Sequence, residues 1–162
     1  MWADLHIHSR YSDGSLTIEE ILSASAERKL DCISVVDHDS TAGQRKVIEM
    51  APNFGITAIT GVEISAWYVS PKTGVGKKIH LLGYGFRLPG QNISSLCASV
   101  LAARDNMTRR QILILNELGW PVNLDEVEKE AFPATCLFKQ HIMAVLLKKG
   151  RAKHLYGEVY KS

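Results

Sequence analysis

The first 90 residues alternate between short apolar runs and longer segments with a helical repeat of apolar positions. The apolar runs lie just before Ser9 and at residues 31–36, 56–62 and 79–86, and they predict four strands. Residues 15–30 and 42–51 show the helical period, and Thr17 with Glu20 forms a capping-box pattern. We expect Ser40 or Thr41 to cap the second helix. The order of strands and helical crossovers predicts an α/β fold whose parallel sheet curls toward a barrel.

From residue 92 onward the pattern is helical only. Asn92 is expected to cap a long helix that ends before Gly119, and shorter helices are expected at residues 124–131, 138–149 and 153–160. No apolar run after Phe86 has the character of a strand. The sequence therefore predicts two parts, with the four strands in residues 1–91 and a small all-helical subdomain in residues 92–162.

Composition and charge narrow the class of protein. The 162 residues are 46% hydrophobic and 22% charged with a net charge of +2, which is typical of a globular domain and gives no large field toward nucleic acid or membrane. Met1 is followed at once by the first apolar run, with no secretory leader pattern, and no apolar run reaches the length of a membrane span. Cys32, Cys97 and Cys136 lack a C-x-x-C spacing. We expect a cytoplasmic protein with no membrane partner and reduced cysteines.

Two histidines, an aspartate and a turn glycine fall within residues 6–14. Alternate side chains of a strand share a face, so His6 and His8 point the same way, about 6–7 Å apart along the strand. Two imidazoles at that spacing can hold one metal ion, and Asp13 in the following turn can add a carboxylate oxygen. The alternative for an isolated His-x-His is a pair of hydrogen-bonded polar residues.

Further candidates accompany the later strands. His38 and Glu63 come at strand ends and His80 lies on the fourth strand, and barrel proteins gather their chemistry at the carboxyl ends of strands. Four histidines on one face of a sheet would each need a buried partner if they were structural. Mixed nitrogen and oxygen ligands suit two or three divalent ions such as Mn²⁺, Zn²⁺ or Fe²⁺. Closely spaced ions of this kind stabilise the attacking and leaving oxygens of a phosphoryl transfer.

Four segments carry these residues in order: residues 4–14 (DLHIHSRYSDG), 36–40 (VDHDS), 61–65 (GVEIS) and 79–85 (IHLLGYG). Together they resemble the PHP (polymerase and histidinol phosphatase) family, and in particular its stand-alone metal-dependent phosphoesterases. The resemblance implies a distorted (β/α)7 barrel with a helical insertion after the fourth strand. It also implies three divalent ions at the carboxyl ends of the strands.

The resemblance implies these ligands: His6 and His8 for the first ion, Glu63 between the first and the second, His80 for the second, and Asp13 with His38 for the third. All of them except His80 form the implied catalytic set, and a metal-bound hydroxide would attack phosphorus. Related members hydrolyse nucleoside monophosphates or 3′,5′-bisphosphates, or remove 5′ nucleotides from short RNA. Asp4, Asp37 and Asp39 are candidates for orienting the imidazoles.

The helical part resembles the family less closely. Residues 139–142 (KQHI) stand where relatives usually read Arg-Pro-His-Ile, so Lys139 replaces an arginine. The resemblance implies that Lys139 and His141 contact the substrate. Arg104, Arg109 and Arg110 on the long helix are further candidates, and a solvated basic helix face is the alternative for each of them.

The resemblance also leaves alternatives open. The family continues with further strands that bring Ala-His-Pro and Asp-x-His ligands, which these 162 residues do not contain. We expect the chain to be part of a longer enzyme, completed by its remaining carboxyl-terminal part or by a homodimer partner. A non-catalytic metal-binding fragment is one alternative. An amidohydrolase-like barrel that hydrolyses C–N bonds is the other, and such a barrel usually needs a lysine between two metal ions.

Overall fold

The computed structural model describes residues 1–161. The chain forms two compact units, residues 1–100 and residues 101–162. They meet within the long helix α3 (Gln91–Glu117), later than the boundary at residue 91 expected from the sequence. Within the described residues, no helix combines the length and the apolar character needed to cross a membrane.

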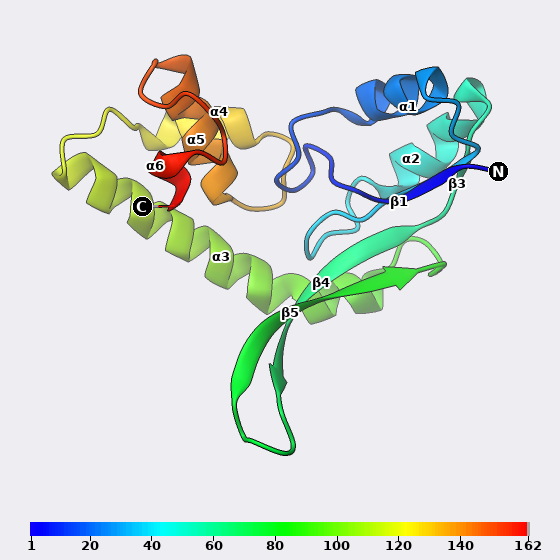
Figure 1. Cartoon of the computed structure of the whole chain (residues 1–162), viewed down its shortest axis with the longest axis horizontal. Coiled ribbons are helices and arrows are strands. Elements are labelled where there is room, and N and C mark those ends of the chain that lie inside the picture. The colour runs from blue at the N-terminus through cyan, green and yellow to red at the C-terminus, as the bar shows by residue number, and fades with distance from the viewer. Residues whose placement is uncertain (162) are drawn as a thin grey trace. The chain divides into compact units, whose positions relative to one another are not determined.

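A three-stranded parallel sheet organises the first unit (Figure 1). Its strands, in spatial order, are β1 (Ala3–Ile7), β2 (Cys32–Val35) and β3 (Thr57–Ala58). The connections contain α1 (Ile18–Glu27), α2 (Gln44–Met50) and the short 3-10 helix η1 (Ala51–Phe54). All four residues of the central strand β2 are buried, as the β-branched run predicts. The mixed α/β fold with a parallel sheet is confirmed.

The start of α1 follows the predicted capping box. The Thr17 hydroxyl accepts the Glu20 N–H at 3.2 Å, and the Glu20 carboxylate accepts the Thr17 N–H at 2.8 Å. The apolar face of α1 then buries Ile18, Ile21 and Leu22 in the core beneath the sheet. Local hydrogen bonds and hydrophobic periodicity therefore agree on where this helix begins.

The start of α2 differs from the prediction. The residue before its first turn is Gly43, and no side-chain hydrogen bond caps the helix. Ser40 instead accepts the N–H of Ala42 at 3.3 Å, and Thr41 contacts the Ser94 hydroxyl at 2.8 Å. The expected cap by Ser40 or Thr41 is therefore wrong, because both hydroxyls bond within or beyond the loop that precedes α2.

The third and fourth predicted strands also differ. β4 (Gly61–Val69) and β5 (Gly76–Tyr84) pair antiparallel, as a hairpin. The loop between them covers only residues 70–75, whereas a parallel connection needs a dozen or more residues. Gly74 takes a left-handed φ of 69° in this turn, and its N–H donates to the Ser70 carbonyl at 2.8 Å. The predicted third strand, residues 56–62, is divided between β3 and the first residues of β4.

The start of β4 lies beside the end of β2, and Gln44 connects the two. The buried Gln44 amide donates to the Val35 carbonyl at 2.7 Å and accepts the Gly61 N–H at 2.9 Å. Further along both segments, His38 and Glu63 form a parallel bridge. A Cβ atom at Gly61 would lie 2.1 Å from the Ser34 hydroxyl, so only glycine allows this close approach. The hairpin therefore extends the edge of the parallel sheet at its carboxyl end.

The second unit is all-helical in its described residues. After α3 it contains α4 (Leu124–Ala131), α5 (Lys139–Lys148) and α6 (Glu158–Lys161), around a core that includes Ile112, Val127 and Leu146. The bounds of α4 are those predicted from the sequence. Asn92 is not the cap of the long helix, because α3 already includes it. Gly119 takes a φ of 78° just after α3, as expected for a residue that ends a helix.

Candidate metal centre

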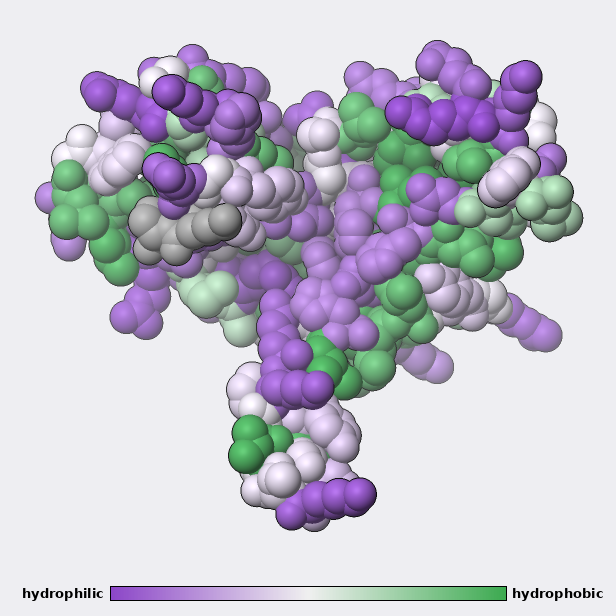
Figure 2. Space-filling view, in the orientation of Figure 1, coloured by the Kyte–Doolittle hydropathy of each residue, from purple (hydrophilic) through white to green (hydrophobic). Residues whose placement is uncertain are grey.

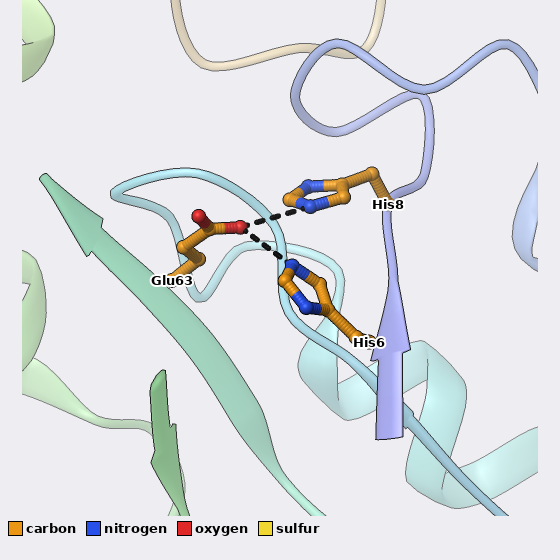
Figure 3. Close-up of side chains that lie close together, drawn as sticks. All are labelled: His6, His8 and Glu63. Carbon is orange, nitrogen blue, oxygen red and sulfur yellow. Dashed lines mark hydrogen bonds and ion pairs between the residues drawn. The ribbon is translucent and has the colours of Figure 1, made fainter. Parts of the chain in front are cut away.

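Six of the predicted site residues come together in the first unit, at the carboxyl ends of β1 and β2 and at the start of the hairpin. Their positions are His6 on β1, His8 just after it, Asp13 in the next turn, His38 after β2, Glu63 on β4 and His80 on β5. Figure 3 shows the side chains of His6, on β1, and His8, just after β1, pointing toward Glu63. Segments separated by up to 74 positions in the chain, from residue 6 to residue 80, thus share one site.

Glu63 lies at the middle of this group. Its Oε2 atom is 2.9 Å from His6 Nε2 and 2.9 Å from His8 Nε2 (Figure 3). The same atom is 3.8 Å from His38 Nδ1. Its Oε1 atom is hydrogen-bonded to His80 Nδ1. Glu63 is only 5% exposed. One buried carboxylate therefore faces four imidazoles, which is the arrangement that a carboxylate bridging two cations needs.

Asp13 joins two of the same imidazoles from the other side. Its carboxylate oxygens lie 3.6 Å from His8 Nδ1 and 3.8 Å from His38 Nε2. The His8 and His38 rings are close, with centroids 4.6 Å apart. These nitrogen–oxygen distances are too long for hydrogen bonds. Two ligands of a tetrahedral ion, each about 2.0–2.2 Å from it, lie about 3.3–3.6 Å from one another, so the spacing suits an ion between them.

The donor set therefore fits divalent cations. Three groups have one ligand atom per residue, all within 4.8 Å of one another: His6, His8 and Glu63; His8, Asp13 and His38; and His38, Glu63 and His80. The His8 Nδ1 atom is buried, and no described residue forms a hydrogen bond with it. A buried ring nitrogen ordinarily has a partner, and a cation would supply one. Imidazole and carboxylate donors together suit first-row divalent ions.

The charge state of Glu63 also supports a site for divalent cations. Burial by itself would raise the pKa of Glu63, but the hydrogen bond from His6 and the neighbouring His38, His80 and His8 outweigh burial. The pKa of Glu63 therefore lies below its ordinary value, and the carboxylate is ionised near neutral pH. An ionised carboxylate is the form that binds a cation.

The turn that carries Asp13 is held by a buried carboxylate. Asp37, 1% exposed, accepts the Ser9 N–H and the Ser9 hydroxyl at 2.7 Å each, and the Ser12 hydroxyl at 2.8 Å. Burial raises the pKa of Asp37, and these hydrogen bonds oppose the rise. A Cβ atom at Gly14 would lie 2.3 Å from the carbonyl oxygen of His8, so the turn folds tightly onto β1. Asp37 therefore holds this turn, and it also interacts electrostatically with His8, so its expected role of orienting an imidazole stays a prediction.

The comparisons with known proteins agree with the motifs. The model of the PHP domain matches residues 4–148. The chain belongs to the PHP family. A phosphoribosyl 1,2-cyclic phosphate 1,2-diphosphodiesterase from Eggerthella lenta is 33% identical over 162 residues, which are 100% of this PHP chain and 60% of that relative. A 5′-3′ exoribonuclease from Haemophilus influenzae is 32% identical over 130 residues, 80% of this chain and 41% of that relative. The chain thus spans about half the length of these two relatives.

A solved structure supports the same fold. A protein from Bifidobacterium adolescentis, described as a metal-dependent phosphoesterase, aligns with a TM-score of 0.84 and 23% identity. The alignment covers 98% of this PHP chain and 55% of that protein. At this identity the likeness concerns the fold.

The predicted substrate-binding residues of the PHP chain lie in its second unit, where they have local contacts. His141 is 6% exposed, and its Nδ1 atom accepts the Phe138 N–H at 3.1 Å at the start of α5. The Lys139 ammonium donates to the Tyr160 carbonyl and lies 4.6 Å from the centroid of the Tyr160 ring. The Arg104 guanidinium lies 4.9 Å from the centroid of the Phe138 ring. The structure thus gives these three residues contacts within the helical unit, and their role in substrate binding stays a prediction.

Arg109 and Arg110 differ from each other. Arg109 is paired with Asp105 and with Glu128, at 2.7 Å in both cases, whereas Arg110 is exposed. Asp105 also accepts the Leu137 N–H at 3.0 Å, which ties α3 to the segment before α5. Arg109 therefore has a structural function within the helical unit.

Asp105 gives the helical unit a measurable pH dependence. Burial alone would raise the pKa of Asp105, but hydrogen bonds from Arg109 and Leu137 lower it below its ordinary 3.8. A lowered pKa means that the ionised group stabilises the fold above pH 3.8 and that this contribution disappears as the pH falls through the lowered pKa.

We expect Asp105→Asn to lower the free energy of unfolding by about 1–3 kcal/mol at pH 7. In urea denaturation this difference should shrink below about pH 4; a difference that stays constant down to pH 2 would contradict the assignment.

Sequence reasoning missed two residues that position the site. Ser9 anchors the turn on Asp37, and Gln44 joins β2 to β4. A serine between His8 and the turn was a visible signal, because a hydroxyl there can bond a neighbouring carboxylate. Gln44 gave no signal, since a glutamine in the first turn of a helix is ordinarily exposed.

Proposed function

We propose that this PHP protein hydrolyses phosphate esters of nucleotide-type substrates by means of divalent metal ions. The observation that carries the proposal is the cluster of four imidazoles and two carboxylates, with ligand atoms within 4.8 Å in three overlapping groups. The names of the two relatives share one chemical feature, a phosphate ester on ribose. We therefore propose a ribose phosphate ester as the substrate, in a nucleoside monophosphate, a 3′,5′-bisphosphate or the end of a short RNA.

The three overlapping groups suggest how ions would be shared. His6, His8 and Glu63 would hold one ion, Glu63 and His80 a second, and Asp13 with His38 a third, and we propose Mn²⁺, Zn²⁺ or Fe²⁺ for these positions. Six side chains cannot complete the coordination of three ions that each take four or more ligands. We propose that the substrate, water and either a further part of the polypeptide or a second copy supply the remaining ligands.

The side chains of the cluster also divide by exposure, which suggests the direction of substrate entry. His6 and His80 have side chains that are 51% and 35% exposed, whereas those of His38 and Asp13 are 13% and 12% exposed. We propose that the phosphate enters from the side of His6 and His80. Bound ions would neutralise the phosphate oxygens and lower the pKa of the attacking water. The ionised Glu63 would fix the spacing of the ions that share it.

The same family assignment supports a proposal about the architecture. We propose that residues 1–91 form the first part of a distorted (β/α)7 barrel and that residues 92–162 form its helical insertion. The extension of the parallel sheet by β4 at the bridge between His38 and Glu63 supports a sheet that continues to curve. The amidohydrolase alternative has less support, because Glu63, rather than a lysine, is central to the observed cluster.

Phosphate release tests the proposed function. The protein is purified as its full natural polypeptide, so that any further ligands are present, and is loaded with Mn²⁺. It is then offered a nucleoside 5′-monophosphate, a nucleoside 3′,5′-bisphosphate, a 5′-phosphorylated RNA oligomer and an aryl phosphate, with an aryl amide as the matched C–N substrate. We expect phosphate release from at least one ester, loss of that release in chelator, and no amide cleavage. Amide cleavage without phosphate release would favour the amidohydrolase alternative, and no turnover of any substrate would contradict the proposal.

Lys139 provides a test of substrate binding in the helical unit. If its ammonium contacts the substrate phosphate, Lys139→Ala should raise KM about tenfold or more and change kcat less, since a charged hydrogen bond is worth about 1.5–3 kcal/mol. Lys139→Arg should restore KM. Lys153→Ala, at an exposed lysine of the same unit, is the control. Equal KM values for the Lys139 and Lys153 variants would remove Lys139 from the substrate site.

A further inference from the structure

The β4–β5 hairpin bears a basic and aromatic surface that the metal centre does not use. The sequence contains no acidic residue between Glu63 and Asp105, whereas the hairpin carries the exposed lysines Lys72, Lys77 and Lys78. The hairpin projects away from the parallel sheet (Figure 1), and its far part is mostly of intermediate hydropathy, with hydrophilic atoms at the tip and nearer the sheet (Figure 2). Its surface is therefore accessible, and its charge favours a polyanionic partner.

The register of the hairpin places part of this surface on the face of the metal centre. Trp67 lies opposite Lys78, and Ser65 lies opposite His80. Because alternate residues of a strand share a face, Trp67 and Lys78 are on the same face of the hairpin as Glu63 and His80. Trp67 is four residues beyond Glu63, about 13 Å at 3.2–3.4 Å per residue. One continuous face thus runs from the metal centre to an aromatic ring and a cation.

The Trp67 ring is exposed and lies against the neighbouring strand. The residue is 69% exposed. A Cβ atom at Gly76 would lie 2.3 Å from Trp67 Nε1, so the indole rests against the Gly76 backbone, where only a glycine leaves room for it. A tryptophan side chain has only two rotatable bonds, so it loses little conformational freedom when a partner stacks on it.

We propose that the Trp67 and Lys78 face of the hairpin binds single-stranded RNA whose terminal phosphate ester occupies the metal centre. The base stacks on the indole, and the ammonium contacts a backbone phosphate, the combination by which proteins hold single strands. Trp67 is too far from Glu63 for the base on the reacting ribose, so it takes a base further along the strand. This proposal rests on the proposed function and adds that the substrate is an oligonucleotide rather than a base-free sugar phosphate.

Binding without turnover tests the proposal. A ten-residue oligouridylate is titrated into the protein in chelator, with tryptophan fluorescence and the anisotropy of a 3′-labelled oligomer as readouts. We expect Trp67→Ala to weaken binding about tenfold or more, the range found for the loss of a stacking side chain. Trp67→Phe should retain most of the affinity while removing the fluorescence quenching. Tyr68→Ala is the matched control, because Tyr68 is the adjacent exposed aromatic residue on the opposite face.

Salt dependence tests the role of the lysine. Lys78→Ala should lower the slope of log K against log salt by about 0.7, the value for one phosphate contact on a single strand. Lys77→Ala, on the opposite face, should change the slope less. The two lysines are neighbours in the chain and equal in charge, so removing either changes the overall electrostatic field of the protein almost equally. A difference between the salt slopes of the two variants therefore reports a direct contact of Lys78 with an RNA phosphate.

Three outcomes would overturn the proposal. These are an absence of oligouridylate binding, an equal loss in Trp67→Ala and Tyr68→Ala, and binding of phosphatidylserine vesicles with the same Trp67 dependence but no binding of RNA. The last outcome would assign the surface to a membrane. Because the titration runs in chelator, it does not depend on hydrolysis. Release of phosphate from a nucleoside monophosphate by the unaltered protein reports separately on the proposed function.

Discussion

Glu63→Gln is expected to abolish phosphoesterase activity while leaving the fold intact. The amide keeps the shape of the carboxylate but removes the charge that faces four imidazoles. Loss of an outer partner of a metal ligand costs about 10–100-fold in affinity or activity, so loss of the central ligand should exceed 100-fold. Phosphate release at saturating Mn²⁺ and the Mn²⁺ dissociation constant from calorimetry measure the two effects.

Glu27→Gln is the matched control for this prediction. Glu27 is an exposed glutamate at the end of α1 in the same unit, and its replacement should leave both the metal affinity and the activity within experimental error. Circular dichroism should give the same spectrum for both variants. Unchanged activity in Glu63→Gln would contradict the role of Glu63 as the shared ligand. Equal losses in the two variants would indicate a general effect of removing a negative charge.

Gln44→Leu is expected to destabilise the first unit strongly. Leucine fills a similar volume but leaves the Val35 carbonyl and the Gly61 N–H without the partners that Gln44 provides. An unsatisfied buried polar group costs about 1–3 kcal/mol, so two of them should lower the free energy of unfolding by about 2–6 kcal/mol. Urea denaturation followed by circular dichroism measures this change.

The control is Gln91→Leu, at an exposed position in the first turn of α3, for which we expect a change within about 0.5 kcal/mol. Because Gln44 also fixes the start of β4, the Gln44 variant should bind Mn²⁺ more weakly even where it remains folded. A stability within 1 kcal/mol of the unaltered protein would show that water or a local shift satisfies the two backbone groups.

Local signals in the sequence were enough to predict most elements of the fold. The capping box of Thr17 and Glu20 marks the start of α1, and the β-branched run before Asp37 marks the buried strand β2. Asn123 caps α4, and the helix ends shortly before Pro133, so its predicted bounds are correct. In each case the short-range hydrogen bonding and the hydrophobic period favour the same structure.

The direction of β5 could not be predicted from apolar runs, because these do not distinguish a parallel from an antiparallel strand. The decisive feature was the loop of residues 70–75, which is too short for a crossover. The position of His80 beside Glu63 did not depend on this error. The face of a strand residue is set by alternation along the strand, and alternation is the same in either direction.

The predicted substrate contacts illustrate another limit of the sequence. A basic residue on a helix can bind a ligand or an acidic neighbour, and its type does not distinguish the two. Arg109 pairs with Asp105 and Glu128, and His141 accepts a backbone N–H at the start of α5. These partners lie up to 19 positions away in the chain, so only tertiary packing brings them together.

The number of metal ions bound per chain tests the central claim most directly. The protein is equilibrated with Mn²⁺, dialysed against metal-free buffer and measured by elemental analysis, beside His8→Ala and the exposed-site control His154→Ala. The claim predicts at least one tightly bound ion per chain, retained in His154→Ala and reduced in His8→Ala, since His8 belongs to two of the three ligand groups. Absence of bound metal, or equal binding in all three proteins, would contradict it.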